Sequence, residues 1–142
     1  MKFMPVVIAS AALCALGAGL PREGLPAEPV IAASAAQAHA EIAYLLDFVA
    51  ASGCEFYRNG STFDAVRAAA HLKEKYEALR LTAQRATAEA FIENAASRSS
   101  MTGRAYEVGC PGKPRTTTTV WLREALARYR QDGASRQNGE RP

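Results

Sequence analysis

The sequence predicts a small α+β domain in which helices pack on a short antiparallel sheet of about three strands. Two observations predict this class. Apolar residues recur at helical spacing in several segments, and short runs rich in aromatic and β-branched residues stand between turn residues. The chain of 142 residues is 49% hydrophobic and 22% charged, which fits one small soluble domain with appendages. The expected order of elements is α-β-β-α-α-β-α.

Residues 41–52 are predicted to form the first helix. Four apolar residues at i, i+3, i+4 and i+7 make one stripe along it. They are Ile42, Leu45, Leu46 and Val49. Gly53 follows, and glycine readily adopts the left-handed conformation that ends many helices.

The dipeptide Asn59-Gly60 lies between two short β-rich runs and predicts a hairpin. A type I′ turn needs positive φ at both central positions, which asparagine and glycine tolerate best. Counting outward from this turn gives the pairs Arg58–Ser61, Tyr57–Thr62 and Phe56–Phe63. Side chains alternate between the two faces of a strand, so Cys54 shares a face with the aromatic pair.

Two helices are expected after the hairpin. Asp64 is a good N-cap for the first, which should run to about residue 81, and Thr87 can cap the second. A single helix over residues 64–96, bent near Thr82, is the alternative.

The last part of the domain is predicted to hold a strand and a helix. Residues 105–110 read as the strand, and Thr119 can cap the helix. The domain is expected over residues 41–130. Residues 131–142 contain almost no apolar side chain and predict a disordered tail.

Residues 1–40 differ in composition from the rest and predict an exported protein. A basic start is followed by an apolar run without a charge over residues 4–20, as in a secretory signal. The Ala/Pro-rich leader then ends in small-x-small patterns, and we expect cleavage after Ala40. Cleavage nearer Gly19 or Ala27, or an uncleaved anchor, are alternatives.

Removal of the leader would take Cys14 away and leave Cys54 and Cys110. An even pair of cysteines in an exported chain indicates a disulfide. The bond would close a loop of roughly 57 residues and contribute about 4 kcal/mol in the chain-entropy model. Two separate buried thiols are the alternative. A zinc site is disfavoured because no second pair of ligands is evident.

Four short motifs in a fixed order carry a resemblance to a known family. They are Cys54-x-Phe56-x-Arg58-Asn59-Gly60, Ala69-Ala70-His71-Leu72-x-x-Lys75-Tyr76, Ala96-Ser97-x-Ser99-Ser100-x-x-Gly103-x-x-Tyr106 and Cys110-Pro111-Gly112. Residues 41–130 resemble the YfeK-like family of small exported proteobacterial proteins, which are built on a domain of unknown function. The resemblance implies a periplasmic protein with this cysteine pair, and it implies no activity.

One side of the helix after Asp64 collects polar candidates. Arg67, His71 and Lys75 are spaced by four residues and project in one direction. Together they suggest an anion-binding edge, or a general base at the histidine. The plainer interpretation is a boundary histidine bonded to a nearby loop, beside two solvated cations.

The loop over residues 97–104 is rich in hydroxyl and guanidinium groups. Ser99, Ser100 and Arg104, with backbone N–H groups, can hold a carboxylate or a phosphate. The plainer interpretation is that the hydroxyls bond the local backbone. Arg58, beside the hairpin turn, is expected to be an exposed arginine.

These residues favour a non-catalytic envelope module that binds an anionic group or a protein partner. A small periplasmic hydrolase that pairs His71 with Ser99 or Ser100 is the alternative, although no Gly-x-Ser-x-Gly elbow is present. Metal-ligand clusters, cofactor loops and basic-aromatic stripes are absent from the sequence, and the net charge is only +3. We therefore expect no metal, no cofactor, no nucleic-acid partner and no stable membrane insertion after cleavage.

Overall fold

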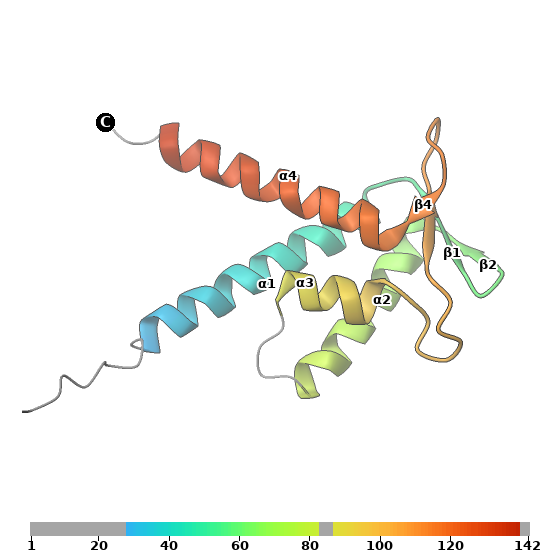
Figure 1. The fold of residues 1–142 in the computed structure, drawn as a ribbon, viewed down its shortest axis with the longest axis horizontal. Helices are drawn as coiled ribbons and strands as arrows, with labels where there is room; N and C mark the ends of the chain where they lie inside the picture. The colour runs from blue at the N-terminus through green and yellow to red at the C-terminus, as the bar shows by residue number, and fades with distance from the viewer. Residues whose placement is uncertain (1–27, 83–86, 140–142) are drawn as a thin grey trace, which may run out of the picture.

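A computed structural model describes residues 28–82 and 87–139 of the chain (Figure 1). Its elements are α1 (Glu28–Ala50), β1 (Glu55–Arg58), β2 (Ser61–Phe63), α2 (Ala65–Thr82), α3 (Ala88–Phe91), η1 (Ile92–Ala96), β3 (Glu107–Gly109), β4 (Thr116–Thr117) and α4 (Thr118–Gly139). Helices and an antiparallel sheet confirm the α+β class. The proposed secretory signal and the alternative cleavage sites near Gly19 and Ala27 lie outside the described residues, and the favoured cleavage site after Ala40 lies within α1.

Within the described residues the sheet has four strands in the order β2-β1-β3-β4. The hairpin register is confirmed. All three predicted pairs are present, namely Phe56–Phe63, Tyr57–Thr62 and Arg58–Ser61. Asn59 and Gly60 have φ values of 52° and 84°, the two left-handed conformations that a type I′ turn requires.

Strand β3 pairs antiparallel with β1 and is shorter than the predicted run over residues 105–110. Val108 is buried and lies opposite Phe56 in this pairing. The fourth strand, which the sequence did not predict, is the two-residue β4 beside β3. A segment of two residues is too short to show alternation, so only its pairing identifies it.

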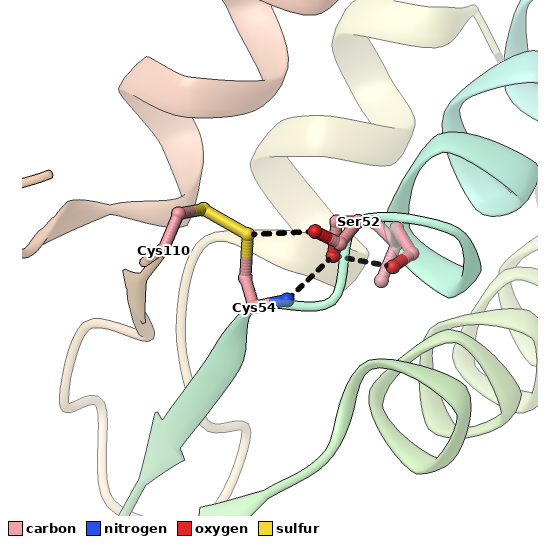
Figure 2. Close-up of a disulfide and its surroundings, with 4 residues drawn as sticks. Ser52, Cys54 and Cys110 are labelled. Carbon is pink, nitrogen blue, oxygen red and sulfur yellow. Dashed lines mark hydrogen bonds between the residues drawn. A yellow bond between two sulfur atoms is a disulfide. The ribbon is translucent and has the colours of Figure 1, made fainter. Parts of the chain in front are cut away.

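A disulfide joins Cys54 to Cys110, as the sequence predicts (Figure 2). Ser52 supports this region, since its hydroxyl donates to the carbonyl oxygen of Val49 at 2.7 Å and accepts from the N–H of Cys54 at 3.3 Å. The Cys54 sulfur also lies 3.5 Å from the Ser52 carbonyl oxygen, a contact only, because a disulfide sulfur carries no hydrogen. The bond thus fastens the segment after α1 to the end of β3.

The two predicted capping residues between the hairpin and the loop are confirmed. The Asp64 carboxylate accepts from the N–H of Arg67 at 2.8 Å, at the start of α2. The Thr87 hydroxyl accepts from the N–H of Ala90 at 3.1 Å, at the start of α3. Thr87 is extended, so α2 and α3 are separate helices rather than one bent helix. Directly after α3 the chain continues as the π-helix η1, whose turns are wider than those of an α-helix.

Helices α1 and α4 both extend further than the sequence predicts. Helix α1 begins at Glu28 instead of residue 41, and α4 continues to Gly139 through part of the predicted tail. Alanine-rich and polar residues can prolong a helix that packing has already nucleated, since each added residue gains a backbone hydrogen bond. The cap of α4 also differs, because the Thr117 hydroxyl, rather than that of Thr119, accepts from the N–H of Val120.

The core lies where α1 packs against α2 and α4 and where η1 packs against α2 and α4 (Figure 1). Its largest fully buried apolar side chains come from five elements: Ile42, Leu45, Val49, Phe91, Ile92, Val108 and Leu122. Among the helices described, none combines the length and the apolar character needed to cross a bilayer.

Candidate functional site

A pocket of about 280 Å³ opens between the hairpin and the first half of α2. Most of its walls are apolar, and several polar or charged side chains line it as well. The apolar side chains are Phe56, Phe63, Ala68, Leu72, Ala96 and Tyr106, and the polar ones that concern us are Arg58, Arg67 and His71. We call these last three residues the cationic rim.

The floor of the pocket is fixed by a buried threonine at the start of α4. The Thr118 hydroxyl donates to the carbonyl oxygen of Ala96 at 2.5 Å, and it lies 3.3 Å from that of Tyr106. The N–H of Thr118 also donates to the Tyr106 carbonyl at 3.0 Å. One residue therefore ties α4 to η1 and to the segment before β3.

The two arginines of the cationic rim gather at one aromatic ring. The guanidinium carbon of Arg58 lies 5.1 Å from the centroid of the Phe63 ring, and that of Arg67 lies 5.9 Å from it. Cations are attracted to the faces of aromatic rings, so Phe63 helps to position both groups. Arg58 comes from the end of β1 and Arg67 from the first turn of α2.

His71 accepts a hydrogen bond from Arg58, whose NH1 lies 2.6 Å from the histidine Nε2. Arginine has only donors, so Nε2 is the acceptor and the imidazole is neutral with its proton on Nδ1. Burial is the main cause that lowers the pKa of His71, and the charges of Arg58 and Lys75 lower it further against an opposing effect of Glu74. The electrostatics and the hydrogen bond thus agree on the neutral form.

Lys75 contacts the loop instead of the pocket. Its Nζ donates to the carbonyl oxygen of Arg98 at 3.0 Å and lies 3.5 Å from the Tyr106 hydroxyl and 5.1 Å from the centroid of that ring. Burial lowers the pKa of Lys75, and the charge of Arg58 lowers it further. Helix α2 therefore meets the loop over residues 97–104 through this lysine.

Within that loop, Ser99 serves the backbone and the hairpin turn. Its hydroxyl accepts from Asn59 Nδ2 at 3.1 Å and from the N–H of Met101 at 3.3 Å, and the side chain is buried. Asn59 Oδ1 in turn accepts from the Thr102 hydroxyl at 2.5 Å. The loop is thereby fastened to the hairpin turn.

The structure brings together only part of the surface that the sequence suggests. Arg67 and His71 line the pocket, whereas Ser100 and Arg104 are exposed and lie outside it. In the ranges 28–82 and 87–139, neither Ser99 nor Ser100 hydrogen-bonds to His71, whose Nε2 is engaged by Arg58.

Sequence reasoning missed Arg58 as a pocket residue. It is half-buried rather than exposed, because its side chain turns over Phe63 toward α2. The predicted pairing of Phe56 with Phe63 located the aromatic wall of the pocket, but periodicity carries no signal for which way the arginine beside a turn will point.

The cationic rim has no acidic partner in the described part of the chain. The ion pairs found there involve other arginines, namely Arg80, Arg98, Arg115, Arg123 and Arg130. Glu74 lines the pocket, but its carboxylate is not within 4.0 Å of a basic nitrogen of the rim. The described residues also include no group of three potential metal ligands. The arrangement is suited to receive an anion.

These features define a small, disulfide-linked α+β domain with an apolar pocket and a cationic rim. Residues 36–130 match the model of a family of unknown function, DUF5329, and the chain belongs to that family. The match begins inside α1, before residue 41, and ends inside α4. Neither a comparison with curated proteins nor one with solved structures finds a match.

Proposed function

We propose that this chain is an exported, periplasmic binding module that recognises an anionic group and has no catalytic activity. Its resemblance to the YfeK-like family and its apolar leader support the compartment. The disulfide between Cys54 and Cys110 supports it as well, since such bonds persist in oxidising environments.

One observation carries the binding proposal: two arginines and a histidine line one hollow, and no carboxylate of the described residues lies at ion-pair distance from them. Arg58 is half-buried and loses some of its hydration, which an entering anion would restore, and Arg67 is exposed at the edge of the hollow. Guanidinium groups bind carboxylates and phosphates with paired, charge-assisted hydrogen bonds. Arg58 and Arg67 are therefore the groups proposed to contact the anion.

The absence of catalysis is proposed from how the candidate groups are used. His71 Nε2 accepts from Arg58, and the Ser99 hydroxyl accepts from Asn59. A general base needs a free lone pair directed at the group that it deprotonates. The Nε2 lone pair of His71 is instead taken by Arg58, and no hydrogen bond among the described residues joins Ser99 to His71.

Titration of the isotope-labelled domain, followed by NMR, tests the binding proposal with acetate, phosphate and 3-phenylpropanoate as probes. We expect at least one anion to shift the signals of His71 and Phe63. Arg58→Gln and Arg67→Gln should each weaken that binding about fivefold or more, the loss of one charged hydrogen bond. Arg80→Gln is the matched control, because Arg80 is on the same helix but pairs with Glu77.

If no probe shifts the pocket signals, or if Arg80→Gln weakens binding as much as Arg67→Gln does, the binding proposal is wrong. The proposed compartment has a separate test, which is expression of the full chain with its leader in a Gram-negative host. A processed chain in the periplasmic fraction is expected. A full-length cytoplasmic chain with free thiols at Cys54 and Cys110 would refute export.

A further inference from the structure

We infer that the ligand of the pocket is a small monocarboxylate with an apolar body, its carboxylate on Arg58 and Arg67 and its body among the aromatic and aliphatic walls. This inference rests on the proposed binding of an anion and adds the chemical class of the ligand. Three properties of the pocket support it: the charges at its rim, the character of its walls and its size.

The rim offers two planar guanidinium groups beside a neutral imidazole. Arg58 is held by its bond to His71 at 2.6 Å, and both arginines lie near the Phe63 ring. A guanidinium fork matches the planar carboxylate group in shape and in the spacing of its donors. Glu74 at the edge of the pocket would repel an anion of high charge, which favours a single negative charge.

The walls are unsuited to a fully hydrated inorganic anion. Phe56 and Leu72 are buried core residues whose side chains also border the hollow, and Ala68 and Ala96 add small apolar surfaces. An apolar group that packs against these walls would strengthen binding, since each buried methylene increases affinity roughly fourfold. Phosphate or acetate would contact the rim and leave this surface in water.

The volume limits the ligand to a small molecule. Small-molecule pockets have volumes of about 300–1,000 Å³, and at about 280 Å³ this pocket lies at the lower end of that range. A carboxylate joined to one ring or to a short branched chain has this size. The anion 3-phenylpropanoate, which has a carboxylate, a two-carbon spacer and one ring, is a suitable probe.

Calorimetric or NMR titration with four probes tests the inference. These are 3-phenylpropanoate, its neutral amide 3-phenylpropanamide, acetate and inorganic phosphate. We expect 3-phenylpropanoate to bind at least tenfold more tightly than each of the other three.

The other outcomes separate the two proposals. If acetate or phosphate binds as tightly as 3-phenylpropanoate, the apolar body contributes nothing; the inference then fails while the proposed anion binding stands. If the amide binds as tightly as the acid, charge recognition fails and so do both proposals. If none of the four binds, the proposed function itself is wrong.

A variant of the wall gives a second test. Ala68→Leu adds bulk to the pocket wall on α2 and should weaken binding of 3-phenylpropanoate about fivefold or more while leaving acetate binding unchanged. Ala78→Leu is the control, because Ala78 is exposed on the same helix and outside the pocket. Equal affinities of the two variants would contradict the inference. If Ala68→Leu does not fold, as judged by circular dichroism, the four-probe titration decides alone.

Discussion

Two arginines of this molecule show how differently one kind of side chain can be used. Arg130 on α4 donates from Nε and NH2 to the two carboxylate oxygens of Glu41, both at 2.8 Å, and from NH1 to Glu89 at 2.6 Å. The Glu41 side chain is only 5% exposed. These bonds raise the pKa of Arg130, and the bond to Arg130 is the main cause that lowers the pKa of Glu89.

Arg58, at the sheet end of the molecule, has no carboxylate partner among the residues that the structure describes. Its neighbours are the neutral His71 and the rings of Phe63 and Tyr106, and its charge lowers the pKa of His71 and Lys75. Arg130 thus completes a contact among α1, α3 and α4, whereas Arg58 is left with unused capacity for an anion. The partners of an arginine, rather than its burial, therefore distinguish a structural contact from a candidate binding site.

The disulfide between Cys54 and Cys110 fastens the sheet end, and breaking it should have the largest effect on stability. Replacing both Cys54 and Cys110 by alanine should lower the free energy of unfolding by about 4 kcal/mol, because the unfolded chain regains the freedom of a long loop. Urea denaturation of the oxidised protein and the double variant measures the difference. The reduced parent should resemble the variant, and a loss under about 1 kcal/mol would show that the bond is dispensable.

The helical end is held by the ion pairs of Arg130 with Glu41 and Glu89, and breaking them should have the second largest effect on stability. Arg130→Gln leaves the buried carboxylate of Glu41 without its partner and should cost about 2 kcal/mol, less than for a fully buried pair because Arg130 is 43% exposed. Arg136→Gln, on the same helix, should change stability by less than about 0.5 kcal/mol. Similar losses for the two variants in urea denaturation would contradict the role given to the ion pair.

The arginine of the candidate site should matter less for stability than Arg130. Arg58→Gln removes the bond to His71 and the contact with Phe63 but breaks no ion pair found among the described residues, so we expect a loss of about 1 kcal/mol in the free energy of unfolding. The variant should also raise the pKa of His71, since the charge of Arg58 lowers it. An NMR titration of the imidazole checks this, and a pKa that falls would be inconsistent with the proposed geometry.

The smallest effect is the dependence of stability on pH. His71 has a pKa below its ordinary value of 6.5 in the folded protein, so the unfolded chain binds the proton more readily. This contribution to stability is complete above pH 6.5 and is lost as the pH falls toward the folded pKa. Arg58 from β1, and Lys75 and Glu74 from α2, are the charged groups that act on it. Urea denaturation at pH 7.5 and 5.5 should show a smaller drop for His71→Gln than for the parent.

The parts of the fold that depend on local chemistry were predictable from the sequence. Asn59 and Gly60 determine the turn and therefore the hairpin register, and Asp64 and Thr87 cap the helices where expected. The even cysteine pair indicated the disulfide. Each of these predictions uses residues whose side chains or backbone preferences act over a few positions.

The features that depend on distant contacts were not predictable in this way. An alanine-rich segment suits both a leader and a helix, so composition could not place the start of α1 at Glu28. Nothing local indicates that Arg58 turns toward His71 or that Lys75 reaches the carbonyl of Arg98. The sequence therefore suggested Arg67 and His71 on α2 as candidate residues and missed Arg58 on β1.

The pocket draws its walls from six separate stretches of the chain, from Phe56 near the start of the domain to Thr118 near its end. During synthesis the hairpin and α2 emerge first, yet the floor closes only when Thr118 bonds to Ala96. A peptide that copied the hairpin and α2 alone would therefore carry the arginines without the hollow. The proposed recognition would therefore arise only when nearly the whole domain has been assembled.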